Sequence, residues 1–217
     1  SRWDNMGAFL GARQCALLME AMRATYVDYS YSSKGDGMNC DRSALLRLIS
    51  GPASEPVSLA SAKLFLRIEH DADDEAIARA LVASRQAAEH YLDFALLPQT
   101  WEYQIANPTV ARIALPFGPA QSIVSVVASY EQTTRTLTPQ EYTLAVDGFC
   151  LRLASLPFGT LTIRYIAASY GTAAEIPLMI TQGILHHLAV MMEQRDGIAP
   201  MPVQSMRCYH PLRRIRL

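Results

Sequence analysis

The spacing of apolar residues changes once along the chain and later changes back, and this constrains the fold more than any other feature. From Gln99 to Tyr170 apolar and polar residues alternate, as in Trp101, Tyr103 and Ile105, which is typical of half-buried strands. Before and after this stretch, apolar residues recur every three or four positions, as on one face of a helix. The pattern predicts five or six short antiparallel strands, including residues 100–105, 112–115, 122–127, 142–146 and 161–165.

Three helices are predicted around this β region, at residues 58–69, 74–96 and 176–195. Ser58 can cap the first, and Pro177 fits the first turn of the third. The carboxylates before and within the first turn of the second helix favour it through the helix dipole. We expect the three helices to share one core that contains Ile77, Leu81, Leu185 and Leu188.

The predicted fold class is therefore α+β. It has a small helical core of two N-terminal helices and one C-terminal helix, an antiparallel β insertion, and extended N- and C-terminal arms. The expected division is an N-terminal arm and linker (1–55), two parts of the helical core (56–98 and 171–197), the β insertion (99–170) and a basic C-terminal tail (198–217).

Composition excludes several classes of protein. Half of the 217 residues are hydrophobic and 18% are charged, which excludes a disordered chain, and no apolar run is long enough to span a bilayer. A formal net charge of −1 argues against a chain that coats nucleic acid over its whole surface. The four cysteines form no C-x-x-C pair, so we expect a reducing compartment, and charged residues interrupt the first apolar stretch, so we expect no export signal.

The sequence predicts no catalytic, cofactor or metal site. It contains no Walker A, G-x-S-x-G or dinucleotide glycine motif. An EF-hand loop starting at Asp71 would need glycine and glutamate where Ala76 and Val82 stand, so helix capping explains the acidic run better. The His186–His187 pair lacks the spacing of a zinc helix. Cys208 with His210 could be imagined as a nucleophile and base, but a proline-bounded tail gives them no scaffold.

The last eleven residues form the one strongly basic element, with four arginines among apolar side chains. This tail could dock on a protein partner, contact nucleic-acid phosphates or stay solvated, and the interleaved apolar residues favour docking. Since Pro200, Pro202 and Pro211 interrupt a helix, we expect an extended path away from the body. The predicted partner-binding residues are Arg207, Tyr209, Leu212, Arg213, Arg214, Ile215, Arg216 and Leu217.

The order of these parts is similar to that of one known family. The features are the capped opening Val57–Lys63, Leu66-Arg67-Ile68 before an acidic loop, a long alanine-rich helix ending Leu96–Trp101, Tyr170-Gly171 before Ile176-Pro177, and the arginine-rich end. Over about residues 56–217 the chain resembles the head-tail connector, or adaptor, proteins of long-tailed double-stranded DNA phages, prophages and gene transfer agents. Ser61 departs from the family, in which glutamate is expected, and residues 1–50 have no counterpart there.

The resemblance implies a structural virion protein without a catalytic site. Copies would form a ring, usually of twelve, beneath the portal protein, joining capsid to tail around the DNA channel. The implied partners are the portal protein, neighbouring copies, a downstream tail-completion or stopper protein and, without sequence selectivity, packaged DNA; no membrane is implied. The implied location is the virion neck, with the host cytoplasm before assembly.

Two alternatives from other classes stay open. One is a small hydrolase or binding enzyme with a site in the β region, for which His186, His187 and Cys150 are the only support. The other is a nucleic-acid-binding regulator that uses the arginine-rich tail.

Overall fold

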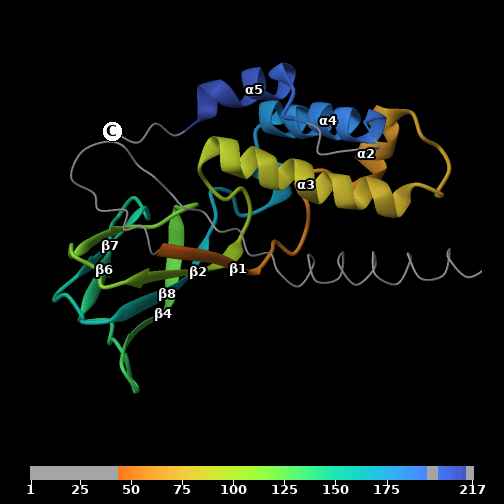
Figure 1. The fold of residues 1–217 in the computed structure, drawn as a ribbon. Helices are drawn as coiled ribbons and strands as arrows, with labels where there is room; N and C mark the ends of the chain where they lie inside the picture. The colour runs from red at the N-terminus through yellow and green to blue at the C-terminus, as the bar shows by residue number, and fades with distance from the viewer. Residues whose placement is uncertain (1–43, 195–199, 214–217) are drawn as a thin grey trace, which may run out of the picture.

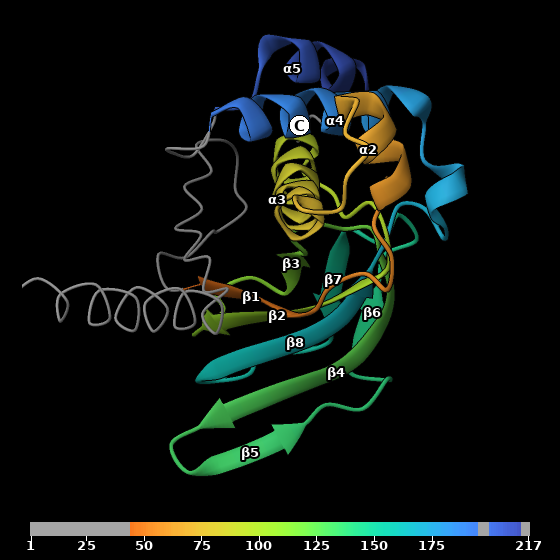
Figure 2. The same cartoon turned by 90° about the vertical axis from the view of Figure 1, so that its right-hand side faces the viewer.

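A computed structural model of the protein describes residues 44–194 and 200–213, which form a layer of helices above two antiparallel sheets (Figure 1). Seen from the side, α5 lies outermost on α4, α4 lies on α3, and the strands lie beneath α3 (Figure 2). The predicted α+β class is confirmed. None of the helices in the described ranges is long and apolar enough to cross a membrane.

Eight strands make up the two sheets. The larger sheet has the order β1-β2-β8-β4-β5 and the smaller has the order β3-β7-β6, with every pairing antiparallel. The strands are β1 (Ala44–Ser50), β2 (Gln99–Ala106), β3 (Arg112–Ala114), β4 (Ala120–Tyr130), β5 (Thr133–Thr136), β6 (Tyr142–Leu144), β7 (Cys150–Leu153) and β8 (Thr160–Ala167).

Alternation explains why the two sheets pack together. Every second residue of β2 and of β8 is buried, so one face of the larger sheet is apolar. This face shares a core with side chains of the smaller sheet, such as Ile113 and Leu151, and Tyr165 at its centre donates a hydrogen bond to the Pro116 carbonyl, 2.6 Å away. Burial on one face holds the register, since a slip of one residue would expose the whole apolar set.

Three strands were not predicted. Residues 44–50 were expected in the arm and linker, but they pair with β2 as an edge strand of the larger sheet. β5 reads Thr-Thr-Arg-Thr and is exposed throughout, so it carries no apolar alternation. β7 begins with two buried residues in succession, Cys150 and Leu151, so the alternation is broken at its start. The prediction that the strands lie between the second and third helices is therefore wrong for β1. This strand precedes every helix in the described residues.

The helices occupy the predicted regions with shorter ends. Ser58 caps α2 (Leu59–Leu66), and its Oγ accepts a hydrogen bond from the Ser61 amide at 3.1 Å. α3 (Asp74–Leu92) ends at Asp93, which has a left-handed φ of 63°, so it is shorter than the predicted helix of residues 74–96. α4 spans Leu178–Glu193 and follows the short 3₁₀ turn η1 (Ala173–Glu175).

The predicted helical core is confirmed. Ile77 and Leu81 of α3 and Leu188 of α4 are buried in one cluster, and Leu185 packs against that cluster. The same cluster contains the residues that follow α3, including Phe94, Leu96 and Leu97, so the helical layer is joined to the start of β2 by buried side chains.

Candidate functional site

The predicted partner-binding segment folds onto the helical layer instead of leaving it. Residues 203–209 form α5 (Val203–Tyr209), and the 3₁₀ turn η2 (His210–Leu212) follows at once (Figure 1). Pro202 stands directly before α5, and Pro211 lies in the first turn of η2, positions where a missing N–H costs little. The expected extended path is therefore wrong for residues 203–212.

The predicted partner-binding residues differ in how far they are buried. Tyr209 is completely buried, so its side chain belongs to the core of this chain and not to a partner-binding surface. Burial raises the pKa of the Tyr209 phenol well above its ordinary value. Leu212 is half-buried against the helical core, whereas Arg207 and Arg213 are exposed. Arg214, Ile215, Arg216 and Leu217 lie outside the described residues, and docking by the segment stays a prediction.

Two contacts hold the C-terminal segment against the helices. The Ser205 hydroxyl donates a hydrogen bond to the Gly183 carbonyl of α4 at 2.7 Å. The Arg213 guanidinium lies 5.2 Å from the centre of the Tyr91 ring on α3, within the range of a cation–π contact. The basic end of the described chain is thus attached above the C-terminal end of α3.

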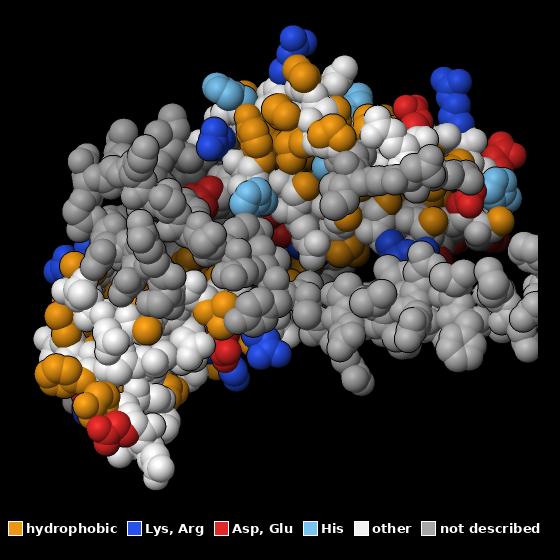
Figure 3. Space-filling view, viewed as in Figure 1, with side chains coloured by type: hydrophobic (Ala, Val, Ile, Leu, Met, Phe, Trp, Pro, Cys, Tyr) orange, Lys and Arg blue, Asp and Glu red, His pale blue; other side chains and the backbone are white. Residues whose placement is uncertain are grey.

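Exposed apolar side chains gather in two separate regions. Figure 3 shows one group over α4 and α5 and another at the far end of the sheets from the helices. On the helices the large exposed side chains are Leu64, Leu178, Met179 and Val203. Scattered apolar residues are normal on a surface, but large grouped ones mark contact sites.

Two aromatic side chains are exposed near the end of β4. Phe158 is 83% exposed and Tyr130 is 56% exposed. Their backbones run close together, since Gly159, with a φ of +82°, lies against the backbone of Ser129 and Tyr130. A Cβ at Gly159 would lie 2.2 Å from the Ser129 carbonyl oxygen, so only glycine fits there.

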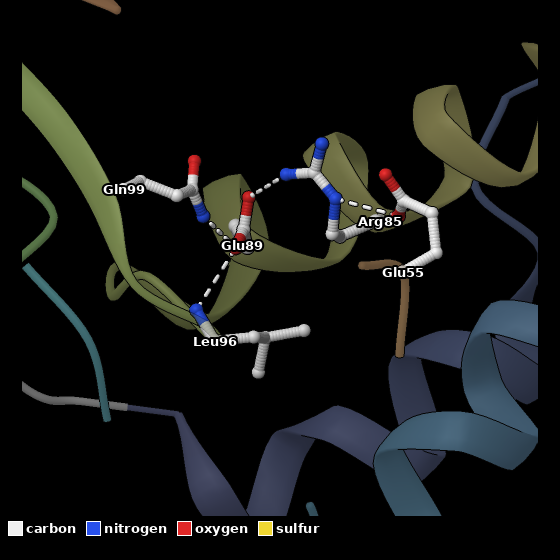
Figure 4. Close-up of polar contacts among 5 residues, drawn as sticks. All are labelled: Glu55, Arg85, Glu89, Leu96 and Gln99. Carbon is white, nitrogen blue, oxygen red and sulfur yellow. Dashed lines mark hydrogen bonds and ion pairs between the residues drawn. The ribbon is translucent and has the colours of Figure 1, made fainter. Parts of the chain in front are cut away.

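A buried polar network joins the helices to the larger sheet (Figure 4). Arg85 of α3 pairs with Glu89 one turn later, 2.7 Å away, and with Glu55 in the segment before α2, 2.8 Å away. Glu89 also accepts hydrogen bonds from the Leu96 amide at 2.9 Å and from the Gln99 side chain at the start of β2. Burial raises the pKa of Glu89, while Arg85 and these hydrogen bonds act in the opposite direction. The network fixes how the β layer is set against α3.

The histidines and cysteines considered as enzyme residues do not come together. His186 packs edge-on against Phe65, with ring centres 5.7 Å apart, and His187 is buried within the helical layer. Cys150 lies on β7, where its sulfur accepts a hydrogen bond from Arg112 Nε at 3.2 Å. Cys208 lies on α5 next to buried Tyr209.

The acidic run before α3 is compensated by a lysine. Lys63 of α2 contacts Asp71 at 2.5 Å and Asp74 at 2.7 Å, and its pKa is raised by these hydrogen bonds. Asp74 and Glu75 stand in the first turn of α3, as the dipole argument predicted, although Asp73 makes no side-chain cap. Within residues 44–194 and 200–213, no group of three His, Cys, Asp or Glu side chains is arranged to hold a metal ion.

Sequence reasoning missed Gly183, the exposed Phe158 and the Arg85–Glu89 pair. The signals were present but ambiguous. A glycine inside an apolar helix indicates close packing without naming the neighbour, and Arg and Glu four residues apart indicate a pair without indicating burial. The exposure of Phe158 had no signal, because Leu-Pro-Phe-Gly at 115–118 is the same tetrapeptide and its Phe117 is buried.

Comparisons with known proteins agree with this architecture. The family model described as "Phage gp6-like head-tail connector protein" matches residues 56–144. A search of the curated proteins gave no significant match.

Several solved structures share the fold. A chain from the neck of an empty gene transfer agent (GTA) particle, computed with C6 symmetry, has a TM-score of 0.66 and 19% identity, covering 80% of this chain and 97% of that one. A chain from the virion of a native GTA particle has a TM-score of 0.65 and 20% identity, covering 79% and 96%. A chain from the neck of a native GTA particle, computed with C12 symmetry, has a TM-score of 0.57 and 19% identity, covering 80% and 97%.

The matched residues 56–144 span α2, α3 and the strands from β2 to β6, and they include Arg85, Glu89 and Gln99 of the buried network. Over these residues the chain is similar to the phage gp6-like head-tail connector family.

Proposed function

We propose that this protein is a structural component of the neck of a phage or phage-like particle, where it joins the capsid to the tail. The observation that carries the proposal is the extent of the fold likeness, since 97% of a GTA neck chain is covered by this chain. The family match over residues 56–144 supports the same assignment.

In this proposal, copies of the chain form a ring, twelve in number, beneath the portal protein, with the DNA passing through the ring. A ring needs head-to-tail contacts, in which each copy offers two different surfaces to its neighbours. The two separate regions of exposed apolar side chains, one on the helices and one around Phe158 and Tyr130, are suited to such contacts.

The proposed partners are the portal protein, neighbouring copies and the next tail component below the ring. DNA contact would be independent of sequence and limited to the assembled channel, because the chain as a whole is nearly neutral. The protein would reside in the virion neck and, before assembly, in the host cytoplasm. We propose no catalytic activity.

Electron microscopy of particles tests the proposal directly. Particles made without this chain should be DNA-filled or empty heads that lack tails, and supplying the chain should restore tailed particles with added density at the neck. An epitope inserted between the exposed residues Ala53 and Ser54 should place antibody label at the head-tail junction. Normal tailed particles in the absence of the chain would contradict the proposal.

Solution measurements separate the alternative classes. A ring-forming protein should elute far above 24.0 kDa or assemble when portal protein is added, whereas an enzyme or regulator would stay a monomer or dimer. Tight, sequence-selective DNA binding by the isolated chain at physiological salt would favour the regulator instead.

A further inference from the structure

Two arginines stand directly opposite each other on the smaller sheet. Arg112 of β3 is in register with Arg152 of β7, and opposite residues of an antiparallel pair have Cβ atoms about 4.5–5.5 Å apart. The next pair in the register, Ile113 and Leu151, is buried against the larger sheet, so the two arginines lie on the outer face, where both are exposed. Like charges placed in this way destabilise a sheet, and an anion bound between them would relieve the repulsion.

The surroundings orient this arginine pair without neutralising it. Arg112 Nε donates a hydrogen bond to the Cys150 sulfur, 3.2 Å away, which leaves the terminal nitrogens of the guanidinium for another acceptor. Asp147 lies near enough to attract Arg112, but within the described part of the chain neither arginine forms an ion pair. Thr143 of β6, opposite Arg152 on its other side, is exposed and adds a hydroxyl to the same face.

The turn that joins α2 to α3 carries the opposite charge. Five carboxylates lie within residues 69–75, which we call the acidic turn, against three nearby cationic side chains, Lys63, Arg67 and Arg79. Glu69 is exposed and, in residues 44–194 and 200–213, has no ion-pair partner. The acidic turn therefore keeps an excess of negative charge.

The arginine pair and the acidic turn lie at opposite ends of the molecule. Figure 1 shows β6 and β7 at one end and the connection between α2 and α3 at the other, and Figure 3 shows Asp and Glu side chains gathered at that connection. One copy cannot bring its own two surfaces together. Neighbours in a head-to-tail ring can, because each copy offers two different surfaces.

We infer that the arginine pair binds carboxylates of the acidic turn of a second copy, and that this contact joins neighbours in the ring. The inference rests on the ring proposed above and names the surfaces that meet in it. Arginine suits this role because its planar fork binds a carboxylate through two N–H groups. The three strands of the smaller sheet contain no further cation, so a carboxylate fits this face better than the repeated phosphates of DNA.

Charge reversal on each side separately tests the contact. One variant combines Arg112→Glu with Arg152→Glu, and the other combines Glu69→Arg with Asp73→Arg, which leaves the ion pairs of Lys63 intact. Each full-length chain, alone and in an equal mixture, is incubated with tail-less heads that lack this chain. The number of copies that sediment with each head is then measured, together with the melting temperature of each variant.

Each variant alone should bind at least about tenfold fewer copies per head than the wild type, because every contact would join like charges. The equal mixture should recover the wild-type number, since copies that alternate around an even-numbered ring join opposite charges at every contact. A chain with all four changes should recover it as well. Arg47→Glu, a reversal at an exposed arginine of the larger sheet, is the matched control and should bind like the wild type.

Assembly of the arginine-pair variant at the wild-type level would overturn the inference. It would also be overturned if the mixture stayed unassembled while both variants kept the wild-type melting temperature, since the arginines would then bind another anion, such as a DNA phosphate. If reversal unfolds the chain, Arg112→Gln with Arg152→Gln removes the charges without adding repulsion and should still lose assembly. In each case wild-type assembly on heads leaves the proposed function standing, whereas a wild-type chain that bound no heads would overturn that function itself.

Discussion

The indole of Trp101 stacks on the ring of Phe117 with centroids 4.7 Å apart and planes inclined by 2°. Trp101 lies on β2, and Phe117 belongs to the first Leu-Pro-Phe-Gly tetrapeptide, between β3 and β4. Phe117 adopts a left-handed φ of 51°, and its carbonyl accepts a hydrogen bond from Ala95, just after α3. The stacked pair therefore lies where the two sheets meet the helical layer.

The two copies of the tetrapeptide allow a matched stability test. Phe117→Ala should lower the free energy of unfolding by about 3–5 kcal/mol, because it leaves a cavity beside Trp101. Phe158→Ala should change it by less than about 0.5 kcal/mol, because Phe158 is exposed. Chemical denaturation followed by circular dichroism measures both, and equal effects would contradict the assigned environments.

Removal of one partner from the buried network should be costly. Glu89→Ala would leave the buried guanidinium of Arg85 with Glu55 alone, and we expect a loss of about 3–5 kcal/mol. Gln86→Ala, at an exposed position of α3, should have an effect near zero. A double variant, Arg85→Met with Glu89→Leu, should lose less than the sum of the single changes, which a double-mutant cycle measures.

The hydroxyl of Tyr209 should be dispensable for stability. It is buried and, among the described residues, has no hydrogen-bond partner, so Tyr209→Phe removes an unsatisfied polar group and should leave the melting temperature equal or higher. Tyr209→Ala should destabilise the protein by about 3–5 kcal/mol through the cavity left on Gly183. A large loss in Tyr209→Phe would show that the hydroxyl is satisfied after all.

The loop between β5 and β6 should contribute less to stability at acid pH because of Glu141. Hydrogen bonds from the backbone amide and hydroxyl of Thr138, followed by attraction to Arg135, lower the pKa of Glu141 below 4.5. Its contribution to stability is therefore present above the unfolded-state value and is lost as the pH falls through the lowered folded-state value. Glu141→Gln should reduce the fall in melting temperature between about pH 6 and pH 3, whereas Glu131→Gln should not.

The location of the helices and most strands follows from sequence period, because a helix or strand with one buried face must repeat its apolar residues at 3.6 or 2 positions. That local rule was sufficient for β2, β8 and the shared core of Ile77 and Leu188. It failed for β5, which is exposed on both faces and has no period to detect, and for β1, whose partner β2 lies some fifty residues further on.

For the candidate site, the chemical character of the segment could be predicted from its residues, whereas its placement depends on packing. Four arginines, interleaved with apolar residues in the last eleven positions, already indicated a docking segment. Only the tertiary structure turned Tyr209 inward and left Arg207 outside, because that choice depends on Gly183, twenty-six residues earlier, offering a helix surface without a side chain. Likewise, two identical tetrapeptides place one phenylalanine in the core and the other on the surface. Burial is a property of what packs against a residue, and packing partners distant in sequence leave no local pattern.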